Sequence, residues 1–187
     1  MGKLIYVTNA SLDGYIEDRT GAFDWSNPDR GLFDFVTELI RPIGTHVLGR
    51  RLYESMAYWD GPVEGYAPEH RDFARAWQQA EQVVFSRTLA DAPPRVARVE
   101  RAFDPEAIRT LKRESARDIF IGGAELAGLA LDAGLVDECH LFVHPVILGG
   151  GKPAFGGALR RDLELLATRR FDAGAIHVRY RVRGATP

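Results

Sequence analysis

The chain has little cysteine and no long apolar run, and neither sign of charge predominates. Among its 187 residues Cys139 is the single cysteine, so one chain cannot form an internal disulfide or a zinc centre held by cysteine alone. The formal net charge is -2, without the basic excess of proteins that bind nucleic acid or anionic membranes. No stretch reaches the roughly 18 apolar residues of a membrane span, and the N-terminus lacks the apolar core of a signal peptide. These absences predict a cytoplasmic protein with a small-molecule partner and no metal site.

The composition is that of a globular protein. Hydrophobic residues make up 45% of the chain and charged residues 27%, which suits one compact domain. The sequence shows no internal repeat, low-complexity segment or linker. We therefore expect a single domain over residues 1–187.

Strand and helix patterns alternate along the first two thirds of the chain. Short runs of β-branched and aromatic residues predict strands, and apolar residues at three- and four-residue spacing predict helices. Asp29 is a predicted N-cap, Pro42 ends the helix that follows it, and Pro105 opens a later helix. The strands are expected at 4–8, 45–49, 82–86 and 118–121, with a weaker edge strand at 95–103, and the helices at 29–42, 50–56, 69–79, 105–114 and 124–133.

The last third of the chain is rich in strand patterns, at 138–148, 163–171 and 176–182. In the last of these, apolar residues alternate with His177 and arginines, which predicts one buried face and one wet, basic face. The whole pattern predicts an α/β fold with a central, mostly parallel sheet, antiparallel C-terminal edge strands and flanking helices.

Three turns that follow predicted strands have the residues of an anion site. They are Gly49-Arg50-Arg51, Ser86-Arg87-Thr88 and Gly122-Gly123. Arginine suits bidentate phosphate binding, and glycine lets a pyrophosphate approach the backbone closely. Ligands of open α/β sheets bind at the carboxyl ends of strands, so the three turns together predict a dinucleotide site. Taken singly, each is better explained as an ordinary turn or a solvated charge, and only their joint occurrence indicates a site.

A glycine-rich run, Gly149-Gly150-Gly151-Lys152, resembles a loose dinucleotide fingerprint, but no helical pattern follows it. We interpret it as a loop near a site, with Lys152 as an optional anion contact. His140 and His144 share a strand face without a third metal ligand nearby, so we interpret them as core or rim histidines.

The end of the first strand carries further polar candidates. Asp13 lies on a turn, where a carboxylate either stabilises its own backbone or faces a substrate. Trp25 offers a flat surface for a nicotinamide, pterin or pyrimidine ring, or packs as a lid residue on the helix of Phe33.

A series of motifs carries a family likeness. In order, they are Ser11-Leu12-Asp13-Gly14-Tyr15-Ile16, Gly21, Trp25, Leu48-Gly49-Arg50-Arg51-Leu52-Tyr53-Glu54, Ile121-Gly122-Gly123, Leu135-Val136-Asp137-Glu138 and Pro145-Val146-Ile147-Leu148-Gly149. The series resembles the dihydrofolate reductase-like superfamily, and within it the C-terminal reductase domain of the bifunctional riboflavin-biosynthesis deaminase-reductase. The resemblance implies a three-layer fold, NADPH as cofactor and a homodimer.

The resemblance also assigns roles to residues. It implies cofactor phosphate contacts from Gly49, Arg50, Arg51 and Leu52, a loop for the 2′-phosphate from Ser86 and Arg87, and a site for the pyrophosphate and nicotinamide ribose from Gly122, Gly123, Ala124, Glu125 and Leu126. On the substrate side we expect Asn9, Trp25 and Ile121. Riboflavin-pathway reductases usually have Glu where Ile121 stands, and neither Asp29 nor Asp34 is in register with the acid of dihydrofolate reductases.

We therefore predict an NADPH-dependent oxidoreductase that transfers hydride to a C=N or C=O group of a small heterocyclic or sugar-linked substrate. Asp13 is the candidate for proton delivery, directly or through water. The alternatives are the riboflavin-pathway reduction of an aminopyrimidine, a dihydrofolate reductase, and an NADPH- or nucleotide-binding module without turnover.

Overall fold

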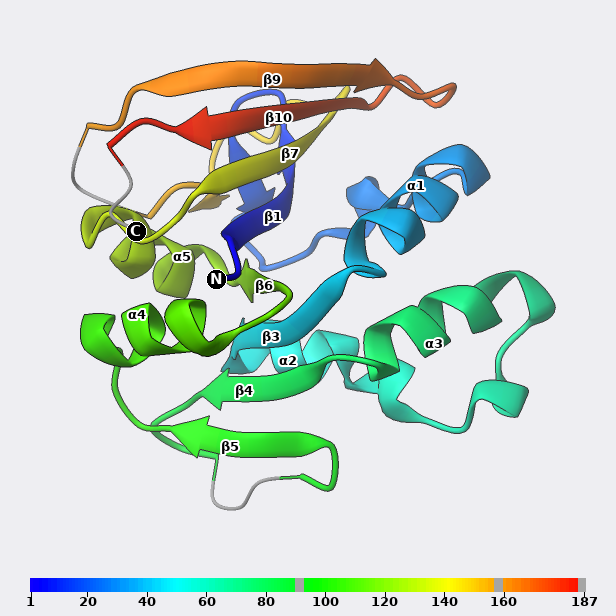
Figure 1. Cartoon of the computed structure of the whole chain (residues 1–187). Coiled ribbons are helices and arrows are strands. Elements are labelled where there is room, and N and C mark those ends of the chain that lie inside the picture. Colours follow the sequence, from blue (N-terminus) through cyan, green and yellow to red (C-terminus); the bar gives the residue numbers. More distant parts are fainter. Residues whose placement is uncertain (90–92, 157–159, 185–187) are drawn as a thin grey trace.

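A mostly parallel sheet forms the centre of the molecule (Figure 1). The structure is a computed structural model that describes residues 1–89, 93–156 and 160–184. The strand order is β5-β4-β3-β6-β1-β7-β10-β9, with β10 antiparallel to β7 and to β9 and the other neighbours parallel. The strands are β1 (Leu4–Ser11), β3 (Ile43–Gly49), β4 (Glu81–Phe85), β5 (Val96–Glu100), β6 (Asp118–Gly122), β7 (Glu138–His144), β9 (Leu163–Arg170) and β10 (Ile176–Val182). The predicted parallel sheet with antiparallel C-terminal strands is confirmed.

Helices cover both faces of this sheet. In Figure 1, α4 (Pro105–Glu114) and α5 (Ala124–Asp132) lie on one face, and α1 (Arg30–Ile40) and α3 (Arg71–Gln78) lie on the other. The short α2 (Arg50–Met56) follows β3 directly and packs with the α1 and α3 side. Helices on both faces explain the long apolar runs in the central strands, such as residues 4–7 of β1 and 119–121 of β6.

The helix ends follow the predicted capping. Asp29 accepts a hydrogen bond from the Leu32 backbone N–H at 2.7 Å, and Asp104 accepts one from Glu106 at 2.9 Å ahead of Pro105. By contrast, α5 begins after Gly123 with no side-chain cap, so its first backbone N–H groups lack a side-chain partner at that position.

The predicted strand 138–148 is wrong in its second part. The strand β7 ends at His144, because Pro145 cannot donate to a sheet ladder, and the chain then turns into a loop. The Leu12 N–H donates to the Val146 carbonyl at 2.8 Å, which holds this loop beside the end of β1.

The predicted faces of the last strand are wrong in its first half, although at its end Val182 is buried and Arg181 is exposed as expected. Ile176 is 45% exposed, whereas His177 is 3% exposed and packs against the Phe35 ring of α1 at 4.8 Å. Arg179, on the same face as His177, binds the buried Glu138 carboxylate at 2.8 Å. The alternating pattern was correct, but α1 covers the polar face, and Leu163, Leu165 and Ile176 on the other face stay exposed.

A small second sheet lies over the end of β1 and was not predicted. It pairs β2 (Tyr15–Glu17) with β8 (Lys152–Pro153). The buried Tyr6 hydroxyl donates to the Ala154 carbonyl at 2.5 Å and ties this sheet to the core. The glycine-rich run serves close packing here, because a Cβ on Gly151 would lie 1.9 Å from the Glu17 carbonyl oxygen.

We predict that Gly151→Ala lowers the free energy of unfolding by about 2–4 kcal/mol, because the added methyl group overlaps backbone and the residue has a φ of +143°. Urea unfolding would measure this. Gly65→Ala is the matched control, since nothing lies within 4 Å of its Cβ position. Equal stability of the two variants would contradict the proposed packing role.

Candidate functional site

A hollow of about 640 Å³ lies where several parallel strands end. It is bounded by the turn from β3 into α2, the segments that follow β4 and β5, the first turns of α5, and Lys152 of β8. Its lining residues are Gly49, Arg50, Arg51, Leu52, Phe85, Ser86, Arg87, Thr88, Arg101, Ala102, Phe103, Gly123, Glu125, Leu126, Leu129 and Lys152. The three predicted turns therefore meet at one site, as parallel strands require.

Positive charge predominates in this hollow. Four arginines and Lys152 line it, against the single carboxylate of Glu125. Glu125 pairs with Lys152 at 2.9 Å, and this hydrogen bond lowers the pKa of the Glu125 carboxyl. Arg51 lies 3.9 Å from Glu17, and Arg87 makes no ion pair within the described part of the chain. The remaining positive charge suits a ligand with more than one phosphate.

Glycines bring two strand ends together at the floor of the hollow. Gly123 has a φ of +98°, and a Cβ there would lie 3.6 Å from the Gly49 backbone. A Cβ on Gly122 would lie 2.2 Å from a methyl group of Leu52. The backbone is thus bare beside the uncapped start of α5, a geometry that suits an anion.

The loop that carries Arg87 is held by its neighbours. The Ser86 hydroxyl oxygen accepts from the backbone N–H groups of Thr88 at 3.2 Å and Leu89 at 2.9 Å. Arg101 donates to the carbonyl oxygens of Ser86 at 3.0 Å and Leu89 at 2.5 Å. Ser86 and Arg101 therefore shape the loop, while Arg87 extends from it.

Most of the predicted cofactor residues line the hollow, and only Gly122 and Ala124 stand behind it. Sequence reasoning missed Arg101 and the apolar residues Phe85, Ala102, Phe103 and Leu129, while Leu52 and Leu126 were predicted. The signal for Arg101 was its place after a strand, because β5 runs parallel to β4 and ends at the same sheet edge. The apolar members, Phe85, Ala102, Phe103, Leu126 and Leu129, give the hollow a non-polar part as well as a basic one.

The Asp13 side chain binds backbone N–H groups of a neighbouring loop. Its carboxylate accepts hydrogen bonds from the Ser11 hydroxyl at 2.7 Å and from the N–H groups of Leu148 at 3.1 Å and Gly149 at 2.8 Å. These bonds lower the pKa of the Asp13 carboxyl, with the Ser11 bond the largest cause. An ionised carboxylate does not donate a proton, so only the route through water remains for the predicted catalytic role.

The expected substrate contact by the Ile121 side chain is not supported. Ile121 is fully buried between Tyr6 and Val47, its partners on the two neighbouring strands, and faces α5. Alternate residues of a strand point to opposite faces, so Phe120 and Gly122 point to the α1 side instead.

Asn9 and Trp25 both contact His144, which we interpreted from the sequence only as a core or rim histidine. His144 Nε2 lies 3.1 Å from Asn9 Oδ1, and the Trp25 ring meets the His144 ring edge-on with centroids 5.6 Å apart. Phe33 packs instead against Trp59, His70 and Phe73, so the alternative of Trp25 lying on Phe33 is not observed.

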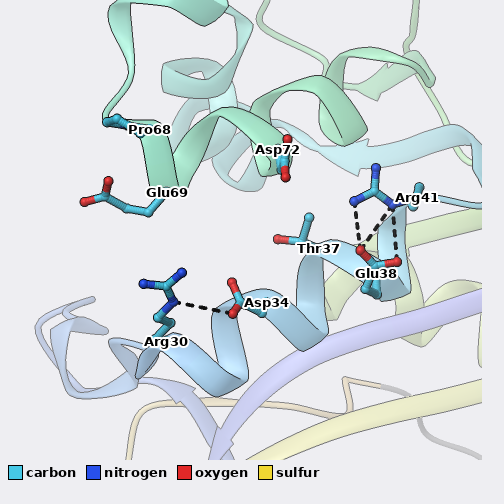
Figure 2. Close-up of a pocket in the computed structure, with 8 residues that line it drawn as sticks. All are labelled: Arg30, Asp34, Thr37, Glu38, Arg41, Pro68, Glu69 and Asp72. Atoms are coloured by element: carbon cyan, nitrogen blue, oxygen red, sulfur yellow. Dashed lines mark hydrogen bonds and ion pairs between the residues drawn. The ribbon is translucent and has the colours of Figure 1, made fainter.

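A second hollow, of about 570 Å³, lies between α1 and the segment that leads into α3 (Figure 2). Its arginines are already paired on their own helix, Arg30 with Asp34 at 3.7 Å and Arg41 with Glu38 at 2.8 Å. Four carboxylates line it, so it does not suit an anionic cofactor. No cluster of three or more His, Cys, Asp or Glu side chains that could hold a metal occurs in residues 1–89, 93–156 and 160–184. No helix among them is long and apolar enough to cross a membrane.

Comparisons with known proteins agree with this arrangement. The uncharacterized protein YyaP of Bacillus subtilis (strain 168) is 31% identical over 97% of this chain and 96% of its own length. Among solved structures, a pyrimidine reductase-like protein from Corynebacterium diphtheriae matches with a TM-score of 0.71 and 18% identity, covering 97% of this chain and 92% of that one.

Two further structures relate the fold to enzymes. A deaminase and 5-amino-6-(5-phosphoribosylamino)uracil reductase from Thermotoga maritima matches with a TM-score of 0.67 and 19% identity, over 97% of this chain and 56% of that one. Dihydrofolate reductase from Enterococcus faecalis, complexed with NADP(H), matches with a TM-score of 0.66 and 17% identity over 97% of both chains. These likenesses show a dihydrofolate reductase-like fold. The family model of the RibD C-terminal domain matches residues 2–177, and the chain therefore belongs to the RibD C-terminal domain family.

Proposed function

We propose that the protein is an NADPH-dependent reductase that transfers hydride to a C=N or C=O group of a small heterocyclic or sugar-linked substrate. The observation that carries this proposal is the hollow itself, which joins four arginines, a lysine, bare glycine backbone and an apolar wall at the strand ends. Family membership and the reductases of the same fold support it.

The residues fit the parts of such a cofactor. The Gly49 turn and the uncapped start of α5 at Gly123 would hold the pyrophosphate. Arg50, Arg51 and Arg87 would bind the 2′-phosphate, for which a guanidinium group offers paired donors. The apolar wall would take the adenine ring.

When bound, the cofactor supplies the hydride, and the protein supplies position and a proton route. Asn9 and Trp25 stand at the end of β1 and just before α1, on the α1 side of the sheet, where we place the substrate. Asp13 accepts hydrogen bonds from the N–H groups of Leu148 and Gly149 beside this edge, where it would order a water molecule rather than act as the acid itself.

Among the alternatives, the folate role has the least support, because neither candidate for its acid is free to act as one. Asp29 caps α1 with one oxygen and accepts from the Ala173 N–H with the other, and Asp34 lines the second hollow. Neither carboxylate therefore faces the edge of Asn9 and Trp25. A module that binds the cofactor without turnover is distinguished by a substrate screen that follows NADPH oxidation.

We predict that a double change of Arg50 and Arg51 to Ala weakens NADPH binding by about 10–100-fold and weakens NADH binding much less, since the lost guanidinium groups contact the extra phosphate. Titration followed by tryptophan quenching and thermal shift would measure both ligands. A double change of Arg30 and Arg41 to Ala, which removes the same charge from the second hollow, is the control. If the wild-type protein binds neither nucleotide, the reductase proposal fails.

We also predict that Glu125→Gln tightens NADPH binding by about 2–5-fold at low salt. The substitution removes the only carboxylate of the hollow and frees Lys152, and partly exposed charges contribute modestly. The matched control is Glu106→Gln, which removes a similar first-turn ion pair on α4, away from the hollow. Weaker binding in the Glu125 variant would mean that the ion pair builds the site instead of competing with the phosphates.

A second proposal concerns assembly. The resemblance predicts a homodimer, and the exposed Leu163, Leu165 and Ile176 on the outer strands β9 and β10 are where we expect a second copy. Sedimentation should show a dimer for the wild type and a monomer for Leu165→Glu. A wild-type monomer at high concentration would refute this.

A further inference from the structure

Asn9 and His144 meet at the ends of two neighbouring strands. Asn9 is paired with Phe142 in the parallel register of β1 and β7, so both residues and His144, two positions on, share one face. Phe142 packs under α1 with Phe35 and Phe171. The Asn9 amide therefore stands where the covered part of this face ends and the proposed substrate edge begins.

The hydrogen bond between them has one possible direction. His144 is 5% exposed, and burial lowers the pKa of its imidazole, so the ring is neutral near pH 7. The Asn9 Oδ1 atom can only accept, so the proton of the neutral ring lies on Nε2. This bond turns the amide so that its N–H2 group points away from His144. Asn9 Nδ2 has no hydrogen-bond partner among the described residues.

Trp25 adds a second unused donor. It lies in a short 3-10 turn, η1 (Asp24–Ser26), and its ring stands at 78° to the His144 ring. The indole Nε1 is buried and finds no partner among the described residues. A buried donor left unpaired is costly, so this N–H calls for an acceptor that the protein does not supply.

We infer that His144 is a positioning residue, which orients the Asn9 amide so that Asn9 and Trp25 together present only N–H donors to the substrate. The inference rests on the proposed function and deepens it. The edge of the substrate that faces Asn9 and Trp25 would then have hydrogen-bond acceptors, such as a ring nitrogen or a carbonyl oxygen, and no hydrogen-bond donor. Donors aimed at such an atom withdraw electron density from the neighbouring carbon, which favours attack by hydride.

Two ring compounds of the same shape test this recognition. Quinoxaline has two acceptor nitrogens, and naphthalene has none. In ¹H–¹⁵N spectra of the labelled protein, quinoxaline should shift the Trp25 indole and Asn9 amide signals, and naphthalene should not. Trp77, whose Nε1 already donates to Asp60 at 3.1 Å, is an internal control. Trp25→Phe assigns the indole signal. No shift of these two signals, or equal shifts with both compounds, overturns the recognition.

The role of His144 is tested separately. The ¹⁵N spectrum should show its proton on Nε2, and a proton on Nδ1 would overturn the positioning role without any variant. His144→Leu should weaken quinoxaline binding by about fivefold, and His144→Gln, which keeps a donor, should restore most of it. His70→Leu is the control. Quinoxaline binding by His144→Leu as tight as that of the wild type would also overturn it.

These experiments are carried out with and without NADPH. NADPH binding in the hollow and quinoxaline binding at the Asn9 edge are measured by different signals. If quinoxaline shifts the Trp25 and Asn9 signals but NADPH does not bind, the proposed function alone is refuted. A protein that binds NADPH but shows no quinoxaline shifts would refute this inference alone.

Discussion

The close approach of the ends of β3 and β6 is the constraint on which the site depends. These strands are neighbours in the sheet, and each turns at once into a helix, so their first helical residues compete for the same space. A glycine relieves that crowding at Gly122, where a Cβ would lie 2.2 Å from Leu52, and Gly123 has a φ of +98° that side-chain-bearing residues rarely adopt. The same absence of side chains leaves the backbone bare for an anion. Close packing and the proposed anion binding therefore both require residues without a side chain at these positions.

The small β2–β8 sheet connects the basic hollow with the substrate edge. On one side Glu17 and Lys152 face Arg51 and Glu125 of the hollow. On the other, Asp13 holds the loop that follows β7, next to His144. Since the Tyr6 hydroxyl ties the same segment to the core, the two halves of the proposed active site share one support.

What could be predicted from the sequence was what depends on neighbours along the chain. The Asp29 cap, the Pro105 helix start and the glycine turns are local signals, and the structure has them where they were expected. The β2–β8 pairing joins residues more than 130 positions apart, and no local pattern encodes it. The faces in the first half of β10 were inverted for a similar reason: alternation shows that two faces differ, while the helix that covers one of them is fixed by the fold. Asp13 and His144 show the same limit, because Leu148 and Gly149 bind Asp13, and Asn9 binds His144, from segments more than 130 positions away.

Net charge is a poor guide to what this chain binds. A formal charge of -2 excludes a general affinity for polyanions, yet the structure separates its charges into two hollows of opposite character. In one, cations outnumber the single carboxylate, and in the other, four carboxylates surround two arginines that are already paired. Charged side chains within about 10 Å of a ligand act on it far more strongly than distant ones at physiological salt. The local excess of cations at the strand ends therefore matters more than the net charge, and a weakly acidic protein can still present a basic hollow such as the one proposed for the cofactor.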